Sequence, residues 1–288
     1  MGIPYIENFD INFGLAGKTA IVTGAASGIG EAIARMFAEK SANVLLVDKN
    51  ASVRDVEKSI NDKLSAGRGG VQSIGGAAAG AANANATSAG AALSGAVSAV
   101  GDITCGEFLQ AIVDAAVGAF GKIDILVNCA GIVLLDDAEN LSEEYWDQTM
   151  AVNLKAAFML SQAVGRYMIR RGGGKIINIA SQASVVSLDR HIAYCASKAG
   201  LVSVTQVLAA EWAEYGINVN AISPTVVLTE LGKKAWAGDV GEAMKKLIPA
   251  NRFGYPDEIA ACAAYLASDA ANLITGANII IDGGFTIK

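Results

Sequence analysis

Short runs rich in Val and Ile alternate with longer amphipathic segments along this chain, and no other feature constrains the fold as strongly. When strands alternate with helices, right-handed crossovers make the sheet parallel and place helices over both of its faces. The chain is therefore predicted to form one doubly wound α/β domain over residues 1–288. The expected strands lie at 19–23, 43–48, 123–128, 175–180, 217–223 and 278–282, and the expected helices near 29–40, 106–119, 143–170, 192–214 and 257–267.

The composition excludes several classes of protein. Hydrophobic residues make up 52% of the chain, which allows a sizeable core, and the net charge of −6 argues against a nucleic-acid surface. The N-terminus has no basic region followed by an apolar run, so we expect no secretory signal and no membrane partner. The cysteines lack CxxC spacing, so we expect free thiols in a reducing cytoplasm and no metal site. They are Cys105, Cys129, Cys195 and Cys262.

One segment interrupts the alternation of strands and helices. Between Ala66 and Gly101, 26 of 36 residues are Ala, Gly or Ser, and Arg68 carries the only charge. Ala and Gly contribute too little transfer free energy for a membrane span. We therefore expect a low-complexity surface insertion at about 66–95, followed by a strand near 96–100 that returns the chain to the sheet.

The stretch TGAASGIG, residues 23–30, follows an expected strand and opens an expected helix. A bound diphosphate needs close approach of the backbone and free N–H groups at a helix N-terminus, and glycine permits that approach. The alternative is that a tight strand-to-helix turn needs the same glycines. We assign the loop to dinucleotide binding, through Gly24, Ser27, Gly28, Ile29 and Gly30.

Asp48 ends the second expected strand, 18 residues beyond Gly30. A carboxylate in this place accepts hydrogen bonds from the adenosine ribose and repels a 2′-phosphate, so it favours NAD over NADP. The alternative is that Asp48 begins a turn, and the neighbouring Lys49 weakens the preference.

Tyr194 and Lys198 lie four residues apart, on one face of an expected helix. A phenol has a pKa of about 10 and is a poor base at neutral pH, but a nearby ammonium is expected to lower that pKa. Such a phenol would take a proton from an alcohol while hydride leaves its carbon. An exposed pair without function is the alternative, because this spacing is common on helices.

Three polar residues near the ends of other strands favour the catalytic interpretation. Ser181 ends an expected strand thirteen residues before Tyr194, and Asn128 ends another. Asn153 lies within the helix that begins near Ser142. The carboxyl ends of the strands are where an open α/β sheet binds its ligands.

Together these motifs resemble the short-chain dehydrogenase/reductase family, which has a Rossmann fold. The resemblance runs from about Leu15 to Phe285, apart from the insertion. It implies that Tyr194 is the catalytic acid/base and that Lys198 lowers its pKa and holds the nicotinamide ribose. Ser181 would polarise the substrate oxygen, and Asn153 would hold a water in a proton relay. The family cofactor positions fall on Asp102, Ile103, Asn128, Ala130, Gly131, Tyr194, Lys198, Pro224, Val227 and Thr229.

The chain resembles one subgroup of the family in particular, the L-xylulose (dicarbonyl) reductases and related sugar-alcohol dehydrogenases. The shared patterns are SPTVVLTELGKKAW and H-x-x-Y-C-x-[ST]-K. The subgroup gives His191 a place in the substrate pocket, beside Ser181 and Tyr194. The alternative is that this histidine lies at the N-terminus of the helix and forms its hydrogen bonds with solvent. Two family residues are replaced, Asn by Cys129 and the Gly of Pro-Gly by Thr225.

The resemblance therefore implies an NAD-dependent enzyme that interconverts a polyol and its ketose by hydride transfer, without a metal. It also implies a homotetramer and a substrate lid at about 228–252. Xylulose reductases commonly use NADPH, so Asp48 points to work in the oxidative direction. A reductase of 3-oxoacyl thioesters or of another ketone is the near alternative, and a non-catalytic dinucleotide sensor is the distant one.

Overall fold

The computed structural model describes residues 10–67 and 95–288, and within them seven parallel strands form one sheet. The strand order is β3-β2-β1-β4-β5-β6-β7, so the sequence order reverses between β1 and β4. Ligands bind outside the carboxyl ends of the strands at such a reversal. The strands are β1 Thr19–Thr23, β2 Asn43–Asp48, β3 Ala96–Val100, β4 Ile125–Asn128, β5 Gly174–Ile179, β6 Ile217–Pro224 and β7 Asn278–Ile281.

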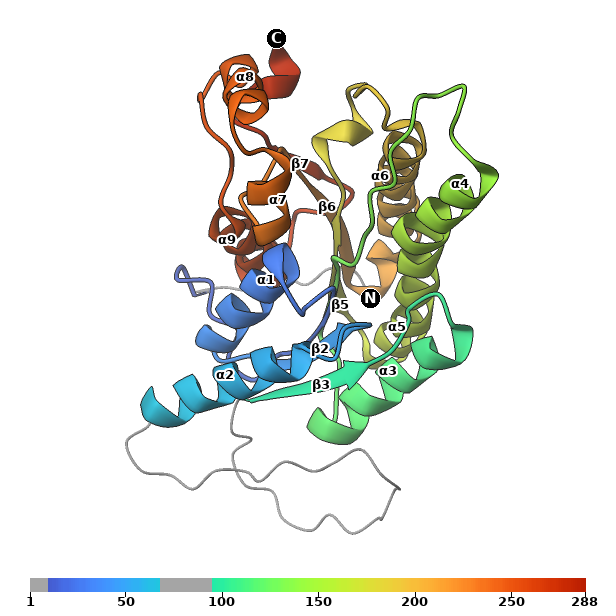
Figure 1. Cartoon of the computed structure of the whole chain (residues 1–288). Helices are drawn as coiled ribbons and strands as arrows, with labels where there is room; N and C mark the ends of the chain where they lie inside the picture. The colour runs from blue at the N-terminus through green and yellow to red at the C-terminus, as the bar shows by residue number, and fades with distance from the viewer. Residues whose placement is uncertain (1–9, 68–94) are drawn as a thin grey trace.

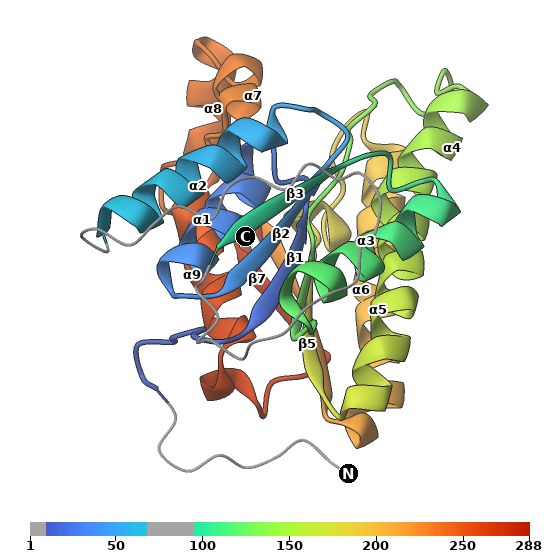
Figure 2. The same ribbon diagram turned by 90° about the horizontal axis from the view of Figure 1, so that it is seen from below.

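Helices cover both faces of the sheet. Figures 1 and 2 show α1, α2 and α9 on one face and α3, α5 and α6 on the other, and each group buries its own apolar cluster. By length and composition α6 could cross a bilayer, but in this fold it packs against β6. The helices are α1 Gly28–Glu39, α2 Val53–Gly67, α3 Gly106–Phe120, α4 Glu143–Met150, α5 Ala157–Arg171, α6 Ile192–Trp212, α7 Glu230–Ala235, α8 Asp239–Leu247 and α9 Pro256–Ala267.

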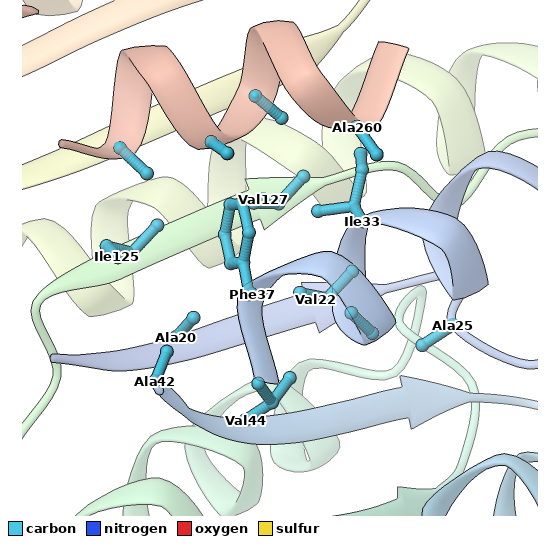
Figure 3. Packing of buried hydrophobic residues seen from close by; sticks show 14 of the residues in the cluster. Ala20, Val22, Ala25, Ile33, Phe37, Ala42, Val44, Ile125, Val127 and Ala260 are labelled. Atoms are coloured by element: carbon cyan, nitrogen blue, oxygen red, sulfur yellow. The ribbon is translucent and has the colours of Figure 1, made fainter. Parts of the chain in front are cut away.

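The core beneath α1 fixes the loop that precedes this helix. Ile33 and Phe37 lie one turn apart on α1 and are fully buried. In Figure 3 the Phe37 ring lies between the sheet residues Val22 and Val127 and the helix that carries Ala260. Because α1 begins within the glycine loop at Gly28, this packing holds the loop against the ends of β1 and β4.

The structure confirms the doubly wound α/β fold and all the expected strands and helices, with boundaries within two residues. The strand expected at 96–100 is β3. Most of the expected insertion at 66–95 lies outside the described residues.

Three helices were not predicted: α2, α7 and α8. The signal for α2 is present, since Val53, Val56 and Ile60 recur at helical spacing and are buried, but polar residues dominate the segment. The helix expected at 143–170 is also more complex, because a π-helical segment, Ala151–Ala156, separates α4 from α5.

Candidate active site

The glycine loop between β1 and α1 tolerates no side chain at its glycines. Gly24 and Gly28 have φ of +69° and +61°, a region that favours glycine. A Cβ atom on Gly24 would lie 2.9 Å from the backbone of Ala130, and one on Gly30 would collide with the carbonyl of Gly24. The turn therefore needs its glycines, and the same turn leaves the N-terminus of α1 open to an anion. Ser27 is the N-cap residue of this helix. Its side chain is exposed and forms no cap hydrogen bond.

Asp48 connects the end of β2 to the glycine loop. Its carboxylate accepts hydrogen bonds from the N–H of Ala26, at 3.0 Å, and of Asn50, at 2.8 Å. The bond from Asn50 shows that the turn interpretation is also correct. The bond from Ala26 places the carboxylate beside the phosphate loop, where it can still accept bonds from a ribose through its remaining lone pairs. Lys49 next to it is exposed.

Asp102 and Ile103 lie just beyond the end of β3, at the same edge of the sheet. The carboxylate of Asp102 accepts hydrogen bonds from the N–H and the hydroxyl of Thr104, both at 2.8 Å. These bonds lower the pKa of Asp102, so the group is a carboxylate at neutral pH. Ile103 is half-buried against the cluster beneath α3.

The segment that follows β4, residues 129–131, forms a wall beside the glycine loop. It is fixed by Thr23, a residue for which no role was predicted. The hydroxyl of Thr23, on β1, accepts hydrogen bonds from the N–H of Cys129 and of Ala130, at 3.0 and 3.1 Å. Burial raises the pKa of the Cys129 thiol to about 12, so the substitution of Cys for the family Asn leaves a neutral group. The amide of Asn128 donates to Ser161 and Asn178 below the wall, at 2.9 and 2.8 Å.

Asn153 lies in the π-helical segment and fixes the loop after β4. Its carboxamide accepts from the N–H of Ile132 at 2.8 Å and donates to the carbonyl of Ile132 at 2.9 Å. It also donates to the hydroxyl of Ser197 at 3.2 Å, and Ser197 in turn donates to the carbonyl of Tyr194. Because both amide hydrogens are used, a water could bind this side chain only as a donor to Oδ1. Ser197, which joins Asn153 to the turn of Tyr194, was also missed.

Ser181, Tyr194 and Lys198 meet at the carboxyl ends of β4 and β5. The Ser181 hydroxyl acts on the phenol of Tyr194 in the direction that lowers its pKa, and the Lys198 ammonium lies 5.7 Å from the centre of the phenol ring. Lys198 also donates to the carbonyl of Ile179 at 2.8 Å. A Cβ on Gly131 would lie 3.6 Å from Lys198 Nζ, which shows how close the wall comes to this group.

The expected lowering of the phenol pKa is wrong for the described state. Burial raises the pKa of Tyr194 above its ordinary value, and the interaction with Ser181 acts in the opposite direction. Lys198 lies over the ring face and is bonded to a carbonyl, and burial lowers its own pKa to about 8. The ammonium therefore lies over the ring without lowering the pKa of the hydroxyl in this state.

His191 precedes α6 and faces the phenol. The two rings meet edge to face with their centroids 6.1 Å apart. The Nδ1 atom lies 2.5 Å from the carbonyl of Asp189, which can only accept, so Nδ1 carries the hydrogen. In the neutral ring Nε2 is then an acceptor, able to pair with a hydroxyl group.

A further polar side chain lies next to Ser181. Gln182 is buried, and its Oε1 has no hydrogen-bond partner among the described residues. Buried amide oxygens are normally paired, so this atom is an exception to the rule. In the sequence, only its position directly after Ser181 points to this residue.

The segment after β6 returns to the glycine loop. The methyl group of Thr229 would lie 3.0 Å from a Cβ on Gly28, and Thr229 caps α7 through a hydrogen bond from Gly232. Val227 pairs with Gly254 in a parallel bridge, which pins the base of the expected lid at 228–252. Pro224 ends β6, at the same edge of the sheet. The structure thus brings all the predicted site residues to the carboxyl ends of the strands.

Two family models match the chain. The model described as enoyl-(acyl carrier protein) reductase matches residues 65–286, and the model described as short chain dehydrogenase matches residues 18–71.

Known proteins resemble the chain over nearly its whole length. An NAD-dependent glycerol dehydrogenase of Listeria innocua is 55% identical, over 98% of this chain and 99% of that protein. A D-threitol dehydrogenase of Mycolicibacterium smegmatis is 50% identical, over 97% of this chain and 96% of that protein. Among solved structures, a gluconate 5-dehydrogenase of Burkholderia cenocepacia, in complex with NADP and tartrate, matches with a TM-score of 0.80 and 32% identity, over 96% of this chain and 98% of that chain.

Proposed function

This chain belongs to the short-chain dehydrogenase/reductase family, and from that premise we propose that it is an NAD-dependent dehydrogenase of a small sugar alcohol. The observation that carries the proposal is the meeting of Ser181, Tyr194 and Lys198 beside the glycine loop. The relatives named for glycerol and D-threitol support the substrate class.

The chemistry follows from the three side chains. NAD, when bound, supplies the acceptor for the hydride that leaves the alcohol carbon. Tyr194 takes the proton of the substrate hydroxyl as general base, and in the reverse direction returns it to the ketone. Ser181 holds the substrate oxygen beside the phenol, and Lys198 fixes the ring and contributes to the ribose site. The acceptor nitrogen of His191 pairs with a further hydroxyl of the polyol.

The cradle for the cofactor fits a dinucleotide by its own geometry. The N-terminus of α1 suits a diphosphate because no side-chain cap hydrogen bond occupies it, and glycine at position 24 lets the loop approach the backbone of Ala130 closely. We assign Ser27, Ile29, Asp102, Ile103, Asn128, Ala130, Gly131, Pro224, Val227 and Thr229 to the surroundings of the cofactor. Asp48 would accept bonds from the adenosine ribose hydroxyls and repel a 2′-phosphate.

An oxidation screen tests the proposal. NADH formation is measured with glycerol, tetritols, pentitols and hexitols, and NADH consumption with an acetoacetyl thioester. We expect turnover of a polyol with NAD and little with NADP. Turnover of the thioester alone would favour the reductase alternative, and tight NADH binding without turnover of any alcohol or ketone would favour the sensor.

Asp48→Ala tests the cofactor assignment. The variant should narrow the preference for NAD over NADP by about tenfold, since it removes hydrogen bonds to a charged acceptor and the repulsion of the phosphate. The ratio of kcat/KM for the two cofactors measures this. An unchanged ratio would show that another group discriminates between them.

We also propose that the enzyme is a homotetramer of the cytoplasm. Large apolar side chains are exposed along the helices of one face, namely Tyr145, Trp146, Met159 and Val207. Covering them against another copy would remove apolar area from water. All four cysteines are free thiols, which suits a reducing compartment. The mass in solution, measured by light scattering, tests the oligomeric state.

A further inference from the structure

Two loops meet at the substrate side of the site through an ion pair. Asp137 lies in the loop between β4 and α4, and Arg190 directly precedes His191. Their atoms Oδ1 and Nε are 3.5 Å apart, and both side chains are a little over half exposed, at 56% and 57%. Figure 1 shows the β4–α4 loop and the segment before α6 together at the end of the sheet where the site lies.

The backbone holds Arg190 in an uncommon conformation. Its φ of +65° lies in the left-handed region, which residues other than glycine rarely adopt. The next residue donates its N–H to Leu188 and binds the carbonyl of Asp189 through its ring, so the turn is fixed on the side of His191. Such backbone strain gathers at binding sites, where the surrounding structure determines it.

Carboxylates outnumber cations on these two loops. The loop after β4 carries Asp136, Asp137 and Glu139, and the segment before α6 carries Asp189 and Arg190. Arg190 is the one cation of the two loops, and Asp137 pairs with it. Lys198 lies deeper and donates to the carbonyl of Ile179. A substrate that enters here therefore meets an excess of negative charge.

We propose that the pairing of Asp137 with Arg190 restricts the site to uncharged polyols and excludes sugar acids. A guanidinium is the group that best binds a substrate carboxylate, and Asp137 neutralises the charge of the one that these loops offer. Asp136, Glu139 and Asp189 form no ion pair within the described part of the chain, so they add repulsion, which lowers the local concentration of anions. The inference deepens the proposed function and rests on it, since it concerns the same pocket.

Freeing the guanidinium tests the inference. Asp137→Asn leaves Arg190 without its carboxylate partner, and Glu139→Gln removes the same charge from the same loop without touching Arg190. For each variant kcat/KM is measured with NAD for a polyol and for the aldonate of equal chain length. We expect Asp137→Asn to shift the ratio towards the aldonate by at least about threefold, and more at low salt. Glu139→Gln should shift it less.

The double variant Asp137→Asn/Arg190→Gln completes the test. It should lose the gain, because the gain depends on the freed guanidinium. An unchanged ratio in Asp137→Asn, an equal shift in Glu139→Gln, or a gain that survives in the double variant would overturn the inference.

A binding measurement separates this inference from the proposed function. Tartrate is titrated into the protein with NADH by calorimetry, which needs no turnover. Tighter binding to Asp137→Asn than to the unsubstituted protein and to Glu139→Gln supports the inference, and equal binding to all three overturns it. A protein that oxidises no polyol, but shows the change in tartrate binding, would contradict the proposed function alone.

Discussion

Two buried lysines lie at opposite ends of the parallel strands. They share burial and a lowered pKa, but their hydrogen-bond partners differ. Lys198 lies at the carboxyl ends of the strands and Lys175 near the amino end of β5. Burial lowers the pKa of each ammonium to about 8. Lys175 donates to the amide oxygens of Asn218 and Asn272, at 2.7 and 2.6 Å, whereas Lys198 donates to one carbonyl and lies over a phenol ring.

The difference teaches that a perturbed pKa does not identify a catalytic group. Burial shifts the pKa of Lys175 as far as that of Lys198, the lysine proposed for the active site. What distinguishes Lys198 is its surroundings: Tyr194 and the close approach of Gly131, at the edge where the glycine loop opens. Lys175 lies instead in a pocket of about 330 Å³ with the ion pair of Lys18 and Asp269.

The largest effect on activity is expected from Tyr194→Phe, which removes the phenol hydroxyl that lies near Lys198 and not near Lys175. General acid–base catalysis contributes about 10²–10⁴-fold, so kcat/KM for polyol oxidation should fall by about 10³-fold. NADH binding, followed by fluorescence, should persist. Joint loss of binding and turnover would mean that Tyr194 supports the cofactor site rather than the proton transfer.

Lys198→Met should lower kcat/KM by about 10²-fold, because the ring loses the cation that positions it. The matched control is Lys175→Met, which makes the same substitution in a group of the same pKa. If the two variants lost activity equally, burial and not the position beside Tyr194 would explain the effect.

Ser181→Ala should change the pH dependence of kcat/KM. The hydrogen bond from Ser181 lowers the pKa of Tyr194, so its loss raises that pKa and reduces the phenolate fraction at any pH below it. Since oxidation needs the base form, log(kcat/KM) should reach its alkaline plateau at a higher pH. Ser181→Thr keeps a hydroxyl and should keep the profile. Identical profiles for the Ala and Thr variants would remove Ser181 from this role.

Lys175→Met should have the smallest effect on activity, within about twofold, and should instead lower the free energy of unfolding. It leaves the buried amide oxygen of Asn218 without its donor, which costs about 1–3 kcal/mol. Urea unfolding at pH 7 measures this. A large fall in kcat with unchanged stability would show that the two ends of the sheet are coupled.

The pH dependence of stability sharpens the same contrast. Between about pH 8 and the ordinary lysine pKa of 10.5, the folded state binds fewer protons at Lys175 than the unfolded state does. The contribution of this group to stability therefore rises with pH in that window, and Lys175→Met should flatten the rise. Lys198 contributes with the same sign, so stability profiles cannot separate the two lysines whereas activity can.

Local patterns predicted the strands and the order of the motifs. The glycine loop could be predicted because the strand before it and the helix after it are local features. Asp48 could be predicted because it ends a buried strand. The pattern for α2 was missed, since its buried stripe of Val53, Val56 and Ile60 is diluted by polar residues. Thr23, Gln182 and Ser197 were missed because their partners are remote in sequence or their role depends on burial.

The sequence by itself determined the parallel sheet, the loop that suits a dinucleotide, and the set of Ser181, Tyr194 and Lys198, because periodicity and spacing are properties of the chain. Only the tertiary structure decided how those groups act on one another. It placed the ammonium over the ring face, raised the phenol pKa through burial, and set Arg190 against Asp137. Burial and charge separation depend on segments far apart in the sequence, so no local pattern encodes them.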